Sequence, residues 1–248
     1  MYIKNSHIAF VYRLLLTMLC ALSIVSHFSL TDHAANSKML AYFTVQSTIF
    51  VFVVFIPVTI YTFFEIKDHN VPFYRYKLPT LRGMATLAIL VTFLSYQFML
   101  KDTGFTMYSY RSIYSFMKDN LVHFVIPLMT ILDWILFSPK GLFKWYDCLL
   151  WLLYPLCYLG YILFRGLTFP PSAFVNIPKW PYFFLNVDKL GLQKVLIIVC
   201  IYIVFILGLG LLIYFMDKLF LLLGNKLQKL SIRLHRHQKE ASSERKKC

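Results

Sequence analysis

The sequence has little acidic charge and few cysteines, and both shortages narrow the possible functions. Only 11 Asp and Glu stand against 25 Lys and Arg, and nearly all of these charges lie between long apolar runs. The five cysteines suggest no disulfide framework and no metal-spaced cluster with histidine, so we expect no metal and no cofactor. The chain also lacks internal repeats and the glycine-broken helix pairs that are typical of transporters.

Apolar residues are abundant: they make up 59% of the chain, and the mean hydropathy is +0.64. A helix needs about 20 apolar residues to cross a hydrocarbon core about 30 Å thick. Six runs meet this length, approximately at 8–30, 40–64, 82–100, 119–137, 145–164 and 194–223. The sequence therefore predicts an all-α integral membrane protein. A six-helix transmembrane bundle over residues 1–223 is followed by a basic tail over residues 224–248.

The net charge of +14 follows a membrane-topology pattern and does not indicate a nucleic-acid partner. With both termini in the cytoplasm, 17 of the 25 Lys and Arg lie inside, in agreement with the positive-inside rule. We therefore expect both termini in the cytoplasm. Segment 226–239 places leucines at helical spacing among basic residues. It fits either an amphipathic helix on anionic lipid or a solvated tail.

Two of the predicted spans carry polar side chains at the same depth. Thr44 in the second span and His123 in the fourth each lie about four residues, roughly 6 Å, below the outer surface. A threonine hydroxyl is a good nucleophile only when a base takes its proton, and neutral imidazole is the usual base. Thr44 and His123 are therefore a candidate nucleophile and base. The alternative for each is a structural hydrogen bond between helices.

Several neighbours of this pair can donate a hydrogen bond to a developing oxyanion. Ser47 lies on the same helix face as Thr44, Gln46 is offset from that face, and Asn120 lies one turn before His123. We expect Gln46, Ser47 and Asn120 to contact the substrate. Polar contact between helices is the alternative for each of them.

The fourth span also contains an aspartate and a proline. Asp133 lies about 15 Å deeper than His123 and points roughly 80° away from it, so it cannot orient that histidine. A structural or proton-relay role is the favoured interpretation of Asp133. Pro127 has no N–H, so the carbonyl of His123 loses its usual helical partner, and we expect a local distortion of the helix.

The connection 165–194 is too apolar for an ordinary solvated loop. It contains four prolines and several aromatic residues, including Trp180 and Tyr182. Aromatic residues of this kind gather at membrane interfaces. We therefore expect the loop either to fold onto the outer mouth of the bundle or to anchor at the lipid headgroups.

Four blocks carry a resemblance to a known group: 42-YFTVQS-47, 120-NLVHFVIPLMTILDW-134, 151-WLLYPLCYLGYILFRG-166 and 180-WPYFFLN-186. In this order they resemble the Pr6Pr family of prokaryotic six-transmembrane proteins, which is related to the androgen-induced-gene/ADTRP (FAR-17a-like) family of intramembrane threonine hydrolases. The resemblance covers residues 8–217. It implies hydrolysis of fatty acid esters of hydroxy fatty acids (FAHFA), with Thr44 as nucleophile and His123 as base.

The remaining expectations concern further site residues and location. Asp133, Arg165 and Asn186 are further residues expected to contact the substrate, and we expect a place in the bacterial cytoplasmic membrane with the site near the outer leaflet. The family usually shows a Tyr-Pro-aromatic-Leu-acid pattern in the loop block. Here Phe183 replaces the proline and Asn186 replaces the acid, so the activity of this chain can differ from that of the family.

The leading hypothesis is therefore an intramembrane lipid-ester hydrolase whose partners are membrane lipids and whose substrate enters laterally. A non-catalytic receptor for a lipid or small ligand is the first alternative, because the same polar layer can bind without reacting. A transporter with Asp133 as coupling residue is the second. The scarcity of acidic groups in the spans makes the transporter the weakest of the three.

Overall fold

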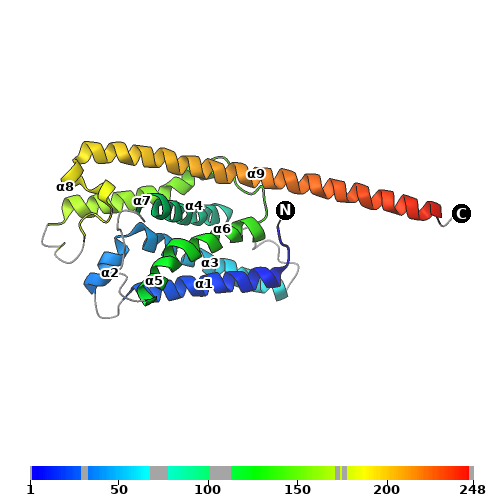
Figure 1. The fold of residues 1–248 in the computed structure, drawn as a ribbon, viewed down its shortest axis with the longest axis horizontal. Helices are drawn as coiled ribbons and strands as arrows, with labels where there is room; N and C mark the ends of the chain where they lie inside the picture. The colour runs from blue at the N-terminus through cyan, green and yellow to red at the C-terminus, as the bar shows by residue number, and fades with distance from the viewer. Residues whose placement is uncertain are drawn as a thin grey trace.

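The computed structural model describes residues 2–28, 33–67, 78–100, 113–170, 174 and 178–245. Within these residues all regular structure is helical and no strand is present (Figure 1). The longer helices are α1 (Ser6–His27), α3 (Phe43–Lys67), α4 (Pro79–Ser95), α6 (Ile126–Phe137), α7 (Asp147–Thr168) and α9 (Leu192–Arg245). The shorter ones are α2 (His33–Leu40), η2 (Tyr96–Leu100), α5 (Ile113–Asn120), η4 (Leu121–Val125), η6 (Phe183–Leu185) and α8 (Val187–Leu190).

Six helical segments in this described part are long and apolar enough to cross a membrane, which confirms the predicted all-α, six-span fold. They are Ser6–His27, Phe43–Lys67, Pro79–Leu100, Phe116–Phe137, Asp147–Thr168 and Leu192–Arg233. Their ends lie within a few residues of the predicted ones, apart from the last. α9 continues as one helix of 54 residues, so the basic segment after residue 223 extends the sixth span as helix and projects beyond the bundle (Figure 1).

Helix α4 lies at the centre of the bundle and packs against α3, α6, α7 and α9. Small side chains allow this central position, because they let neighbouring helices approach closely. Gly83 shows the effect: a Cβ there would lie 2.2 Å from Cζ2 of Trp151 on α7. Ala85 and Ala88, further along α4, are fully or almost fully buried.

The bundle has two ends that differ in structure. One end carries the short helices α2, α5 and α8, and the start of α1 lies at the other end with the projecting part of α9 (Figure 1). We call the first the Thr44 end, because α3 begins there, and the second the Asp133 end. Both chain termini therefore lie on the Asp133 side of the bundle.

Two of the six spans contain a π-helical turn, and both turns lie at the Thr44 end. η2 continues α4, and η4 joins α5 to α6. In η4 the N–H of Ile126 bonds to the carbonyl of Leu121, five residues back. The next residue, Pro127, has no N–H to donate. The distortion expected near Pro127 thus takes the form of a π turn, a feature often found at functional sites.

Candidate active site

Thr44 and His123 come from different helices and meet inside the bundle. Thr44 lies in the first turn of α3, and His123 lies in the π turn η4. Oγ1 of Thr44 is 3.3 Å from Nε2 of His123, and both side chains are buried. The two residues that the sequence places at one depth are therefore in direct contact.

The other nitrogen of His123 faces an aspartate that the sequence interpretation did not single out. Nδ1 lies 3.1 Å from the carbonyl oxygen of Asp119 and 3.1 Å from its carboxylate oxygen Oδ1. Both partners only accept hydrogen bonds when the carboxylate is ionised, so Nδ1 carries the proton of the neutral ring. The lone pair of Nε2 then points at the Thr44 hydroxyl. A hydroxyl, an imidazole and a carboxylate thus form a Thr44–His123–Asp119 triad.

Tyr96 fixes both the histidine and the aspartate of this triad. Its ring stacks on the imidazole of His123, with centroids 3.9 Å apart and planes 11° from parallel. Its hydroxyl donates to Oδ2 of Asp119 over 2.7 Å. Tyr96 is the first residue of η2, so the two π turns bring these side chains together.

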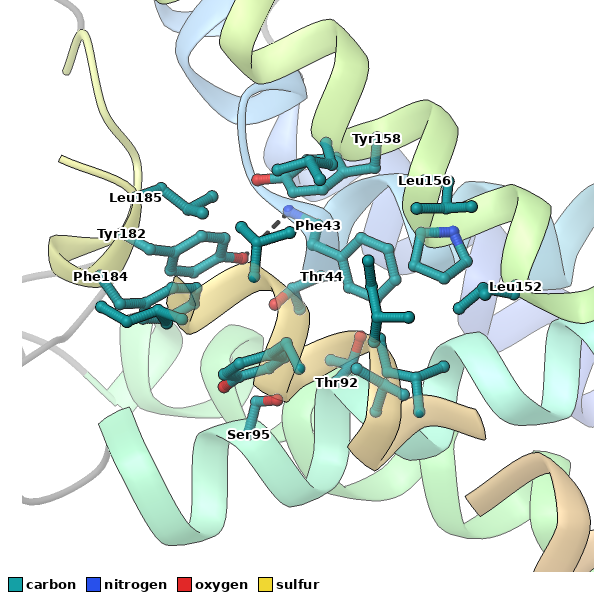
Figure 2. A pocket seen from close by; sticks show the side chains of 18 of the residues that line it. Phe43, Thr44, Thr92, Ser95, Leu152, Leu156, Tyr158, Tyr182, Phe184 and Leu185 are labelled. Carbon is teal, nitrogen blue, oxygen red and sulfur yellow. Dashed lines mark hydrogen bonds between the residues drawn. The ribbon is translucent and has the colours of Figure 1, made fainter. Parts of the chain in front are cut away.

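A second tyrosine contacts the nucleophile side of the triad. The hydroxyl oxygen of Tyr182 accepts the backbone N–H of Phe43 at 3.0 Å and also makes hydrogen-bonding contact with Thr44 (Figure 2). This position is the N-terminus of α3, where backbone N–H groups have no partner within the helix. Burial raises the pKa of Tyr182 to about 12, so its hydroxyl keeps its proton at neutral pH. It is therefore a hydrogen-bond donor beside Thr44.

The loop that carries Tyr182 is held firmly on the bundle. Nη1 of Arg165 donates to the carbonyls of Pro178 and Lys179, each at 3.0 Å. The ring of Trp180 lies over Gly166, where an added Cβ would come within 2.3 Å of it. Trp180 and Tyr182 are buried, whereas Phe183 is 56% exposed. Of the two arrangements expected for this loop, the described part thus folds onto the bundle.

The charged side chains of this loop also bind one another. Asp188 accepts from Nζ of Lys179 at 2.9 Å and from the indole N–H of Trp180 at 2.8 Å. These hydrogen bonds, first from Lys179 and then from Trp180, lower the pKa of Asp188. The carboxylate therefore stays ionised and keeps Trp180 in place over the helix below it.

Thr44 lines a cavity that is mainly apolar (Figure 2). The cavity has a volume of about 100 Å³, several times the space that one water molecule needs. Its wall is formed by α3, α4, α7, α9 and the loop around η6. The lining residues include Phe43, Thr92, Ser95, Leu152, Leu156, Tyr158, Tyr182, Phe184, Tyr202 and Ile203. His123 is not among the lining residues and lies behind Thr44.

One wall of the cavity is accessible from the outside of the bundle. Leu156 on α7 lines the cavity and is 37% exposed, and Ile198 and Ile203 on α9 line it and are half-buried. Residues that face outward from a membrane-spanning helix face lipid tails. These lining side chains of α7 and α9 therefore also reach the outer surface of the bundle.

Three residues predicted to contact substrate near Thr44 have other partners. The side-chain amide of Gln46 donates to the carbonyl of Leu40 at 2.7 Å, and that of Asn120 donates to Phe116 at 2.9 Å. Ser47 is fully buried and bonds to the carbonyl of Thr44. None of the three lines the cavity as far as the structure describes it.

The other three predicted contacts, Asp133, Arg165 and Asn186, also lie outside the described cavity wall. Asp133 is part of a buried ion cluster: Oδ1 accepts from Arg13 Nε at 2.7 Å, and Oδ2 accepts from Arg82 Nη2 at 2.6 Å. Asn186 caps α8 by accepting the N–H of Lys189. Arg165 acts on the loop and not on the cavity. These side chains are occupied by bonds that hold the fold together.

Three residues at the site, Asp119, Tyr96 and Tyr182, are not among those predicted from the sequence. A signal for Asp119 was present, because it precedes His123 by four residues and such pairs meet on one helix face. Tyr96 had no comparable signal, since its contact depends on how two spans pack.

Comparison with known proteins provides no relative whose function could be transferred to this chain. No protein-family model, no curated protein and no solved structure matches it. The function must therefore be inferred from the side chains themselves. Their arrangement places a threonine hydroxyl in contact with an imidazole at the wall of a mainly apolar cavity.

Proposed function

We propose that the protein is an intramembrane hydrolase of lipid esters. The observation that carries the proposal is the Thr44–His123–Asp119 triad, whose hydroxyl end lies at the wall of the apolar cavity. A hydroxyl, a base and an orienting carboxylate in this order form the arrangement that activates nucleophiles in acyl transfer. An apolar cavity open toward lipid suits an ester with long acyl chains.

In the first half of the reaction, Oγ1 of Thr44 attacks the ester carbonyl carbon while its proton passes to Nε2 of His123. Asp119 holds the imidazole in the tautomer that can accept this proton and stabilises the imidazolium that forms. The tetrahedral intermediate then expels the alcohol. The leaving oxygen takes the proton from Nε2, and the acyl group remains on Thr44.

In the second half, water replaces the alcohol. His123 takes a proton from the water as its oxygen attacks the acyl carbon, and then returns the proton to Oγ1 of Thr44 when the bond to threonine breaks. The products are a fatty acid and an alcohol, and the triad is restored. The site lies at one end of the bundle, which supports a water supply from the adjacent membrane surface.

The negative oxygen of the intermediate needs a hydrogen-bond donor. Tyr182 supplies one in this proposal, because its hydroxyl lies in the cavity wall beside Thr44 and keeps its proton at neutral pH. The N-terminus of α3, with its partial positive charge, lies at the same point. Tyr182 therefore takes the role that the sequence interpretation gave to Gln46, Ser47 and Asn120.

The remaining expectations about this protein belong to the same proposal. The resemblance to the Pr6Pr family, the FAHFA-type substrate, the cytoplasmic position of both termini, and a bacterial cytoplasmic membrane with the site near its outer leaflet are all consistent with a lipid hydrolase. A lipid receptor would use the same cavity without turnover. The fixed partners of Asp133 favour a structural role for that residue over ion coupling in a transporter.

A fluorophosphonate probe tests the proposal, because it reacts with hydroxyl nucleophiles that a base has activated. We expect the protein, purified in a non-ionic detergent, to be labelled at Thr44. Thr44→Ala and His123→Ala should each reduce labelling at least about 10³-fold. Labelling is measured by in-gel fluorescence and the modified residue by peptide mass spectrometry.

Thr48→Ala is the matched control, since Thr48 lies one turn further along α3 and its hydroxyl bonds only to the carbonyl of Thr44 in the structure described. It should label like the wild type. Unchanged labelling in both Thr44→Ala and His123→Ala would refute the hydrolase. An unlabelled wild type that copurifies with an intact lipid would favour the receptor.

A further inference from the structure

The described residues of the cavity wall include no charged side chain. No Asp, Glu, Lys, Arg or His is among the described residues that line it. Its polar groups are all hydroxyls, from Thr44, Thr92, Ser95, Tyr158, Tyr182 and Tyr202. A hydroxyl can donate and accept one hydrogen bond at a time without carrying charge, so this wall suits uncharged oxygen atoms.

The charged groups around the cavity are already engaged. Asp119 pairs with His123 and accepts a hydrogen bond from Tyr96, on the side of Thr44 that faces away from the cavity. Arg165 donates to two backbone carbonyls, and its guanidinium lies 4.8 Å from the ring centre of Phe174. Lys179 pairs with Asp188 in the loop. None of these groups is placed in the wall where it could neutralise an anion inside the cavity.

Tyr158 donates to the carbonyl of Ala41, and the other five hydroxyls lie at two places along the cavity. Thr44 and Tyr182 mark the reaction centre, and Thr92 and Ser95 of α4 lie across from the loop (Figure 2). Tyr202 of α9 interacts with Ser95 and stacks on Phe184, with ring centres 5.1 Å apart. The second group thus forms a neutral polar patch beyond the reaction centre. Apolar side chains from α7 and α9 lie beside it.

We propose that the substrate is an uncharged glyceride ester, such as a diacylglycerol, in place of the FAHFA-type ester that the resemblance implies and that carries a carboxylate, and that lipids with a charged group beside the ester are rejected. This inference rests on the proposed hydrolase function and specifies its substrate class. An acyl chain fits the apolar wall between α7 and α9. A glycerol hydroxyl can donate to the oxygens of the patch, since Thr92 and Tyr202 use their own protons on Ala88 and Met99. A phosphate beside the ester would enter the cavity without a partner, which is costly in a low-dielectric site.

The test compares diacylglycerol with phosphatidic acid of the same acyl chains, which differ only in the phosphate. Both are presented to the purified protein at equal mole fraction in non-ionic detergent micelles, and released fatty acid is measured. We expect kcat/KM for diacylglycerol to be at least about 10-fold higher, the ratio that corresponds to roughly 1.4 kcal/mol. Equal rates, or faster cleavage of phosphatidic acid, would overturn the inference and leave the hydrolase proposal intact.

A charge placed in the wall sharpens the test. Ser95→Lys should raise the ratio of phosphatidic acid to diacylglycerol turnover at least about 10-fold, because the ammonium supplies the missing partner. Ser95→Ala is the control that removes the hydroxyl without adding charge: it should lower diacylglycerol turnover, because the glycerol hydroxyl loses a partner, and it should not raise phosphatidic acid turnover, which only Ser95→Lys should do. If Ser95→Lys does not fold, the ratio of kcat/KM for diacylglycerol to that for phosphatidic acid in the wild type still tests the proposal. Failure of the wild type both to cleave either lipid and to react with fluorophosphonate would refute the hydrolase and this inference together.

Discussion

The run α5–η4–α6 carries two buried aspartates, and their surroundings are opposite in kind. Asp119 lies at the Thr44 end and contacts the imidazole of His123 and the phenol of Tyr96. Asp133 lies 14 residues, or about 21 Å, further along and contacts the guanidinium groups of Arg13 and Arg82. One carboxylate thus faces a ring that can gain or lose a proton, and the other faces two permanent cations.

This difference separates a reactive end of the bundle from a structural end. An imidazole beside a carboxylate can take up a proton at moderate cost, so the Thr44 end is suited to proton transfer. An arginine stays protonated, so the cluster at the Asp133 end can only hold helices together. Arg13 also donates to Thr62 at 2.8 Å, so the cluster links α1, α3, α4 and α6. The following substitutions test whether the two ends divide chemistry and stability in this way.

Asp119→Asn should give the largest effect on activity. The asparagine fills the same space, but it cannot stabilise an imidazolium and can present an N–H to Nδ1, which favours the wrong tautomer of His123. We expect kcat to fall about 10³–10⁴-fold with little change in thermal stability, by analogy with the same change in other triads. Hydrolysis of an uncharged ester and thermal unfolding are measured on one preparation. A fall of less than tenfold would show that Asp119 does not support the histidine.

Asp133→Asn should act on stability. It leaves two buried guanidinium groups without their anion, a change that costs about 3–5 kcal/mol in folded proteins. Unfolding in detergent is followed by circular dichroism. Asp188→Asn is the control, because its ion pair with Lys179 is at the surface, where solvent screens it, and its loss should leave the unfolding transition near that of the wild type. If the two variants unfold with equal stability, the hypothesis that the Asp133 end is structural is contradicted.

Gly166→Ala should disturb the loop over the reactive end by an intermediate amount. The added methyl would lie 2.3 Å from Trp180, so the ring and the loop with Tyr182 must shift, at a cost of about 1–3 kcal/mol. We expect activity to fall with loop order, measured by protease cleavage and ester hydrolysis. Gly160→Ala on the same helix meets nothing within 4 Å and should behave like the wild type. Similar results for both glycines would show that the Trp180 contact does not position Tyr182.

Tyr96→Phe should give the smallest effect. It removes the hydrogen bond to Asp119 and keeps the ring that stacks on His123. Loss of one such bond corresponds to about 1 kcal/mol, so we expect kcat/KM to fall roughly fivefold. The pH profile of kcat/KM should shift as well, because the carboxylate that faces His123 loses a donor. An unchanged rate and profile would show that Tyr96 serves packing alone.

The fold was predictable from the sequence because membrane crossing has a simple length requirement. Runs of about 20 apolar residues mark the spans, and the six segments observed agree with them. The end of the sixth span was less well predicted, since a polar sequence such as the one after residue 223 can continue as helix without a change in its local pattern. The distortion near Pro127 was predictable from the missing N–H, although its form as a π turn was not.

The candidate site was predictable only in part. Thr44 and His123 were predicted as a pair because they lie at the same depth below the membrane surface, and the structure places them in contact. Depth says nothing about rotation, however, and the rotation of each helix decides that Gln46 and Asn120 bond to their own backbone neighbourhood. The partners of Asp133 likewise required knowledge of which helices adjoin α6.

The sequence by itself determined the class of this protein, its six spans and the level at which polar groups lie, because hydropathy and the rise per residue are local properties of a chain. Tertiary structure alone decided which of those groups face one another: that Asp119 and Tyr96 complete the site, that Tyr182 comes from a distant loop to the start of α3, and that Asp133 is enclosed by arginines. The physical reason is that a hydrogen bond needs its atoms within about 3 Å. Such precision arises from the packing of whole helices and is not encoded in any one of them.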